Sequence, residues 1–293
     1  MKKHILLLCL ICLGAQQVRG QSYHRQRVDF AFLNLGLNAC VGGLGALINK
    51  HPGEKAHRVF LKGFGQGLLG GTLSYYGKGF TYQIHKHNQL RYSYLAKLTH
   101  AAGASITQNA ACNRNFWERW HLNVGLFRLE YEVLNKQFHM RILPSTVVAA
   151  IAVGSQSKLN LRHSLAMGTV IMEKDGDFTV NGLSGRAIGY STIIGIDQNI
   201  VGEEFYYLMA HEALHTLQYD HMIWLNPLFY KPDKQWKKDL KWYQQLSKYL
   251  YFDLNGISIW TLYFLQRNQP WECRWIEREA DIFSAHIAHP GCP

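Results

Sequence analysis

Residues 208–221 read Leu-Met-Ala-His-Glu-Ala-Leu-His-Thr-Leu-Gln-Tyr-Asp-His, and the central run from His211 to His215 decides the fold that we expect. Two histidines four positions apart lie on the same face of a helix. Glu212 follows the first of them. A catalytic zinc ion takes neutral imidazole ligands and keeps a coordination position for water, from which a nearby carboxylate removes a proton. The spacing therefore predicts a zinc helix with His211 and His215 as ligands and Glu212 as general base.

The third ligand sets the class of this zinc site. Residues 275–281 read Trp-Ile-Glu-Arg-Glu-Ala-Asp, and in a helix Glu277 and Asp281 share one face. One of the two can therefore bind zinc while the other steadies a ligand imidazole, and Glu277 is the better candidate for the third ligand. Glu279 points nearly the opposite way; it is the second choice for the ligand, and otherwise a solvated charge.

His221 is the other candidate for the third ligand, because it follows the second histidine at the spacing found in metzincins. That pattern places a helix-ending glycine where this chain has Gln218, and a methionine turn further on, whereas no methionine follows Met222. A helix that continues through His221 also turns its side chain away from the other two histidines.

The two motifs together resemble the signatures of membrane-associated gluzincins, namely the heat-shock-type and CaaX-prenyl-type metalloendopeptidases and the related antibiotic-sensor peptidases. The shared features are the aspartate five residues after the second histidine, here Asp220, and the Glu-x-x-Ala-Asp run that ends at Asp281. The resemblance implies that His211, His215 and Glu277 bind zinc, that Glu212 is the base and that Asp281 supports a ligand imidazole. Because the sequence has no second cluster of this kind, we expect one Zn²⁺ per chain. The resemblance covers the two motifs alone, and this chain lacks the several strong membrane spans of those families.

The first twenty residues have the pattern of a cleavable signal peptide. Lys2 and Lys3 precede an apolar run over 5–13, and Gly20 suits cleavage before Gln21. We therefore expect an exported protein of the periplasm or cell envelope, a location that allows association with the membrane. The chain is 47% hydrophobic and 17% charged, enough for one large core or two modest ones.

The mature chain is basic. Residues 1–20 contain three basic residues and no acid, so 28 basic and 20 acidic residues remain, a formal charge of +8. That balance favours anionic surfaces such as lipid headgroups. No nucleic-acid-binding motif occurs. The four cysteines outside residues 1–20 permit two disulfides, and nearness in sequence suggests Cys273 with Cys292 and Cys40 with Cys112.

Residues 21–115 form a Gly/Ala-rich region that we expect to be helical. Small residues recur four apart at Asn38, Gly42 and Ala46 and again at Gly63, Gly67 and Gly71, which lets helices approach closely. The stretch 30–48 is either a membrane span or part of a tightly packed soluble hairpin. A third helix is predicted over 92–111.

Residues 116–293 are predicted to form a zincin-like domain, so the whole chain is assigned to the α+β class. Period-two alternation indicates a central antiparallel or mixed sheet. Its expected strands are 127–133, 140–142, 147–153, 165–172, 178–180 and 190–196. The expected helices are 202–219, which carries the zinc motif, 234–250, a basic amphipathic stretch, and 271–288.

These observations predict a zinc-dependent metalloendopeptidase that acts on a protein or peptide substrate. The candidates for the donor that stabilises the oxyanion are Tyr219, His221, His286 and His289. The alternative is a non-catalytic zincin-like envelope protein that binds a membrane or a partner protein. A purely structural zinc site needs no base, so the intact Glu212 favours the enzyme.

Overall fold

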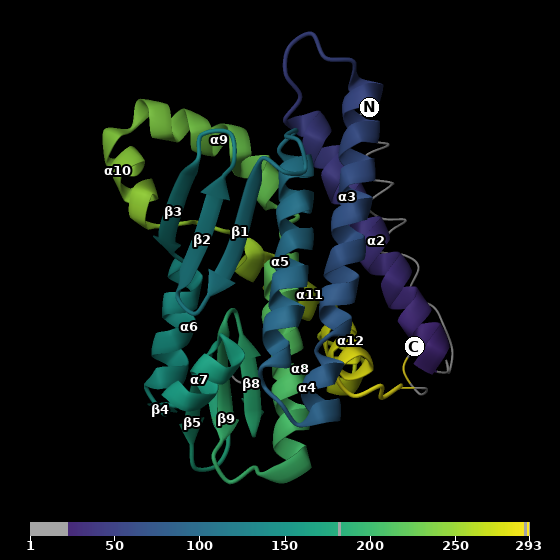
Figure 1. Cartoon of the computed structure of the whole chain (residues 1–293), viewed down its shortest axis with the longest axis vertical. Helices are drawn as coiled ribbons and strands as arrows, with labels where there is room; N and C mark the ends of the chain where they lie inside the picture. The colour runs from purple at the N-terminus through teal and green to yellow at the C-terminus, as the bar shows by residue number, and fades with distance from the viewer. Residues whose placement is uncertain (1–22, 181–182, 290–291, 293) are drawn as a thin grey trace.

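The computed structural model describes residues 23–180, 183–289 and 292. The predicted signal peptide, residues 1–20, lies outside them. Long helices combine with small sheets, which confirms the α+β class. Figure 1 shows three long helices side by side along one flank of the molecule, with the sheets along the other flank and α8 between them.

The flank of long helices consists of α2 (Tyr23–Ile48), α3 (Ala56–Gly79) and α5 (Tyr92–Ala111), and α5 has the predicted bounds. A β-carbon added at Gly63 would lie 2.5 Å from the carbonyl oxygen of Gly42 and 2.7 Å from the β-carbon of Ala46. The backbones of α2 and α3 therefore touch, and the predicted close approach of the small-residue faces is confirmed.

Helix α2 is the single helix of the described residues that is long and apolar enough to cross a membrane. Its polar residues Asn34 and Asn38 are buried inside the protein, whereas Phe32 is 75% exposed. The core helix of a soluble protein has the same length and composition, so both alternatives for residues 30–48 stay predictions.

The strands form two main sheets and a separate hairpin, instead of the single central sheet predicted. In the first, β1 (Arg119–Val124), β2 (Phe127–Glu132) and β3 (Gln137–Ile142) are antiparallel neighbours. The second has the order β4-β5-β9-β8, with β5 and β9 parallel. Its strands are β4 (Lys158–Leu159), β5 (Val170–Lys174), β8 (Ala187–Tyr190) and β9 (Ile193–Asp197), and the hairpin is β6 (Phe178–Val180) with β7 (Leu183–Gly185).

Two predicted strands were wrong. Residues 147–153 belong to helix α6 (Pro144–Gly154), because an apolar run without alternation fits either element and proline at the first turn favours the helix. Residues 165–172 include the end of α7 (Leu161–Met167) and the start of β5. Gly168, at φ +63°, ends α7 in the left-handed conformation that suits glycine.

The C-terminal part is helical, as predicted, with different boundaries. The helices are α8 (Gly202–His221), α9 (Asn226–Asp239), α10 (Lys241–Tyr249), α11 (Asn255–Leu265), the 3₁₀ turn η1 (Trp271–Cys273) and α12 (Trp275–Ser284). The single helix predicted over 234–250 is broken at Leu240, whose backbone is extended. Helix α8 packs against β8, the short α4 (Tyr82–His87) and α12.

One of the two predicted disulfides is present. Cys273 and Cys292 are bonded, with an S–S distance of 2.06 Å, whereas Cys40 and Cys112 do not form a disulfide. A β-carbon added at Gly45 would lie 2.8 Å from the backbone of Ala111, so α2 meets the end of α5 about five residues beyond Cys40. Five residues of helix span about 7.5 Å, which is more than a disulfide bridges.

We predict that Gly63→Ala destabilises the protein by about 1–3 kcal/mol, because its methyl group would meet backbone atoms of α2. Gly65→Ala is the matched control on the same helix, since a β-carbon there meets nothing within 4 Å. Alanine at an open helical position should stabilise by about 0.5–1 kcal/mol. Urea unfolding of both variants measures this. Equal effects would contradict the close packing of α2 and α3.

Candidate metal centre

Three potential ligand atoms meet between α8 and α12. The Nε2 atoms of His211 and His215 lie 3.1 Å apart, and Oε2 of Glu277 lies 3.4 Å from each of them. A tetrahedral zinc ion with ligands at about 2.0–2.1 Å separates them by about 3.3 Å. The three distances therefore match three corners of a zinc tetrahedron, with a fourth corner remaining for water or substrate.

The Nδ1 atoms of the two imidazoles, which face away from the three ligand atoms, have hydrogen-bond partners of their own. His211 contacts Oδ1 of Asp281 through Nδ1 at 2.8 Å, and His215 contacts Oε1 of Gln218 through Nδ1 at 2.8 Å. On the other side of Asp281, Nε2 of His289 contacts Oδ2 at 2.6 Å. These contacts aim both Nε2 atoms at one point, which is the arrangement that metal-ligating histidines require.

Glu212 is buried beside the imidazoles, with 5% of its surface exposed. It lies against Gly189 of β8, where an added β-carbon would be 2.7 Å from its Oε2. A residue with a side chain at position 189 would therefore displace the carboxylate. Burial raises the pKa of Glu212, while the charges of His215 and His211 oppose that shift.

The acids and imidazoles of the cluster shift one another's pKa. Burial disfavours ionisation of Glu277, yet the charges and hydrogen bonds of His215 and His211 bring its pKa well below the usual value. Burial also lowers the pKa of His211, but hydrogen bonds to Asp281 and Glu277 outweigh it and raise that pKa to about 10. The carboxylates of the cluster thus stabilise a positive charge on the imidazole of His211.

No family model, curated protein or solved structure matches this chain. The geometry of the cluster and its two motifs therefore carry the functional interpretation.

Among the described residues, the group that could hold a metal ion consists of His211, His215 and Glu277. His221, the metzincin-like alternative, instead lies with its Nε2 atom 3.1 Å from Nδ2 of Asn38. Burial and the charge of Lys78 lower the pKa of His221 well below the usual value.

The predicted oxyanion donors have other contacts. The hydroxyl of Tyr219 lies 2.5 Å from Oγ of Ser145 and donates to Asp253 at 2.9 Å. The ring of His286 stacks on Tyr82, with centroids 3.7 Å apart. His221 contacts Asn38 and His289 contacts Asp281, as described above. Which of the four donates to an oxyanion stays a prediction.

The prediction that Glu279 is a solvated charge was wrong, because its side chain is fully buried. Each of its carboxylate oxygens lies 2.9 Å from Nζ of Lys78, on α3. Its Oε1 also accepts a hydrogen bond from Asn34 at 2.7 Å, and its Oε2 accepts one from Gln218 at 2.9 Å. The N-terminal helices cover the side of α12 that the sequence left without a partner.

Tyr263 of α11 is a residue of the site that the sequence did not indicate. Its hydroxyl donates to Oε1 of Glu277 at 3.0 Å, so the other oxygen of that carboxylate faces the histidines. Burial and the Glu277 charge raise the pKa of Tyr263 well above its usual value, which keeps the phenol a donor. No motif marks this tyrosine, and only the fold brings it to the site.

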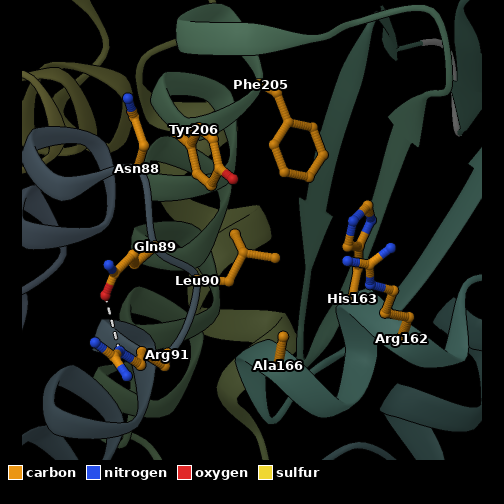
Figure 2. Close-up of a pocket in the computed structure, with 9 residues that line it drawn as sticks. All are labelled: Asn88, Gln89, Leu90, Arg91, Arg162, His163, Ala166, Phe205 and Tyr206. Atoms are coloured by element: carbon orange, nitrogen blue, oxygen red, sulfur yellow. Dashed lines mark hydrogen bonds between the residues drawn. The ribbon is translucent and has the colours of Figure 1, made fainter.

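A separate cavity of about 380 Å³ opens near the N-terminal end of α8. Figure 2 shows the turn 88–91 on one side of this hollow and Arg162 and His163 of α7 on the other, with Phe205 and Tyr206 of α8 at its edge. None of the three potential ligands lines it. The cavity is therefore distinct from the candidate metal centre.

We predict that Lys78→Met destabilises the protein by about 3–5 kcal/mol, because it leaves the buried Glu279 carboxylate without a counter-charge. The double variant Lys78→Met/Glu279→Gln removes both charges and should be more stable than Lys78→Met alone. Urea unfolding compares the two.

The matched control for this prediction is Glu204→Gln, which breaks an exposed ion pair with Arg186. The Glu204 side chain is 54% exposed and the Arg186 side chain 46%. An exposed pair contributes at most about 1 kcal/mol. A loss of stability in Lys78→Met no greater than in this control would contradict the structural role of the buried pair.

Proposed function

We propose that this protein is an exported, zincin-like, zinc-dependent metalloendopeptidase of the cell envelope. His211, His215 and Glu277 would hold the zinc ion, Asp281 would steady His211, and Glu212 would act as general base. The observation that carries the proposal is the tetrahedral spacing of the three ligand atoms, with a buried carboxylate next to them.

A bound zinc ion would supply a water of lowered pKa and a polarised scissile carbonyl. The protein's own part is proton transfer and orientation. Glu212 accepts the proton that the attacking water loses and passes it to the nitrogen of the leaving amine. Gly189 allows that carboxylate to remain beside the cluster, and Asp281 and Gln218 hold the two imidazoles in place. The peptide bond breaks between carbonyl carbon and nitrogen, with water supplying hydroxyl and proton.

We predict about one zinc ion bound per chain in the mature protein. Binding should be lost in His215→Ala, which removes a ligand atom, and in Glu277→Gln, which replaces an anionic oxygen donor with a weaker neutral amide. Glu212→Gln should keep the zinc and lose at least about 100-fold in turnover, since it removes the proton acceptor alone. Metal analysis and cleavage of an unfolded protein such as casein, with and without chelator, provide the two measurements.

Glu203→Gln is the matched control, because this glutamate lies on the same helix with a side chain 83% exposed. It should keep both zinc and turnover. If His221→Ala loses zinc while Glu277→Gln binds it normally, the third ligand is His221, and the gluzincin assignment is wrong in favour of a metzincin-like arrangement. Zinc binding without hydrolysis of any peptide would favour the non-catalytic alternative.

The exposed side chains of α9 and α10 favour association with a membrane. Such association is compatible with both the peptidase and the non-catalytic alternative. Helices α9 and α10 expose Trp236, Trp242 and Tyr249, at 45%, 65% and 67%. They also carry six lysines: Lys231, Lys234, Lys237, Lys238, Lys241 and Lys248. Aromatic rings beside clustered lysines suit the interface of an anionic bilayer, where each lysine contributes about 1 kcal/mol. We propose that α9 and α10 rest on anionic lipid.

We predict that the protein sediments with vesicles of phosphatidylglycerol and phosphatidylcholine, and weakly with phosphatidylcholine alone. Lys241→Gln/Lys248→Gln should reduce the affinity for the anionic vesicles about 30-fold, since two contacts of about 1 kcal/mol are removed. Tyr76→Ala, at an exposed aromatic residue of α3, is the control and should bind normally. Equal binding to both kinds of vesicle would exclude this role of the lysines.

A further inference from the structure

We infer that Gln218 is the positioning residue for the ligand His215, and that the buried pair of Lys78 and Glu279 fixes the orientation of its amide. The inference rests on the proposed zinc site. It adds a residue that neither zinc motif includes, at the position where a metzincin has glycine.

The orientation of the Gln218 amide follows from its partners. Its nitrogen lies 2.8 Å from the carbonyl oxygen of Ile276 and 2.9 Å from Oε2 of Glu279. Both partners only accept hydrogen bonds, so the group between them must be the NH₂ group. The amide oxygen therefore faces Nδ1 of His215, at 2.8 Å. A flipped amide would place its oxygen against the Glu279 carboxylate.

This orientation decides which nitrogen of His215 can bind a metal ion. An oxygen that only accepts requires Nδ1 of His215 to carry a hydrogen and donate it. The neutral imidazole then has its lone pair on Nε2, the atom that faces His211 and Glu277. Gln218 thus selects the imidazole form that a zinc site needs.

The amide can perform this role because its partner Glu279 is itself held by other side chains. Lys78 and Asn34 hold the Glu279 carboxylate, and all three side chains are at most 1% exposed. A run of contacts therefore leads from Lys78 on α3 through Glu279 and Gln218 to His215. The negative charge of Glu279 is neutralised by Lys78 and separated from the imidazole by an uncharged amide, in contrast to the carboxylate that holds His211.

The test measures the zinc dissociation constant by chelator competition, at a temperature where circular dichroism shows every variant folded. Gln218→Met should weaken zinc binding about 10–100-fold, as loss of a group that orients a ligand does. Gln218→Asn keeps a polar side chain but withdraws the amide oxygen by one methylene, so it should also weaken zinc binding. This second variant provides the test if Gln218→Met does not fold. In the zinc-loaded wild type, NMR should show a hydrogen-bonded Nδ1–H on His215, and in both variants this signal should shift.

Leu217→Ala is the control for a general loss of stability, since this buried leucine precedes Gln218 on the same helix and its side chain has no atom that could hydrogen-bond to an imidazole. It should lower the unfolding temperature and leave the zinc dissociation constant within about three-fold of wild type. Equal weakening in Leu217→Ala and the Gln218 variants, or an unchanged Nδ1–H signal, would overturn the positioning role. Wild type that binds zinc without cleaving peptides would refute the proposed function and leave this inference standing, whereas wild type that binds no zinc would overturn both.

Discussion

The buried ion pair of Lys78 and Glu279 is the constraint on which the arrangement of the helices depends. Both side chains are fully buried, and a carboxylate so placed is stable only with a counter-charge and enough hydrogen-bond donors. Lys78 supplies the charge, while Asn34 and Gln218 supply amide donors. Four helices, α2, α3, α8 and α12, thus meet at one carboxylate. Separating any of them would leave a charged or polar group unpaired in the interior.

The pair also explains why an apolar, glycine-rich hairpin belongs to the same structural unit as the candidate metal centre. Lys78 and Glu279 are 201 residues apart in sequence, on either side of the boundary predicted at residue 115. Because Gly63 lets α2 and α3 touch, Asn34 of α2 and Lys78 of α3 can reach the same carboxylate. The boundary itself stays a prediction, but the contacts across it include the ones that orient Gln218.

How far the sequence predicted the structure depended on the range of the interactions involved. The helix over 92–111 was predicted with its bounds, and the spacing of His211 and His215 is a local property of one helix. Local pattern failed at 147–153, where an apolar run fits a strand or a helix equally well. The role of Glu279 was missed because its partner is far away in sequence, and Tyr263 was missed because no motif accompanies it.

The balance of buried charge is a further physical argument for a cation at the candidate centre. Glu212, Glu277, Glu279 and Asp281 are each at most 8% exposed. Lys78 neutralises Glu279, which leaves three carboxylates around the two ligand imidazoles and the imidazole of His289, which contacts Asp281. The raised pKa of His211 and that of His215 reflect this excess of negative charge, since both rise despite burial, which alone would lower them. A divalent cation at the point where the three ligand atoms meet would neutralise the same carboxylates while both imidazoles remain uncharged. This balance of charge supports the proposed zinc site, because the spacing of the three ligand atoms also fits a tetrahedral zinc ion.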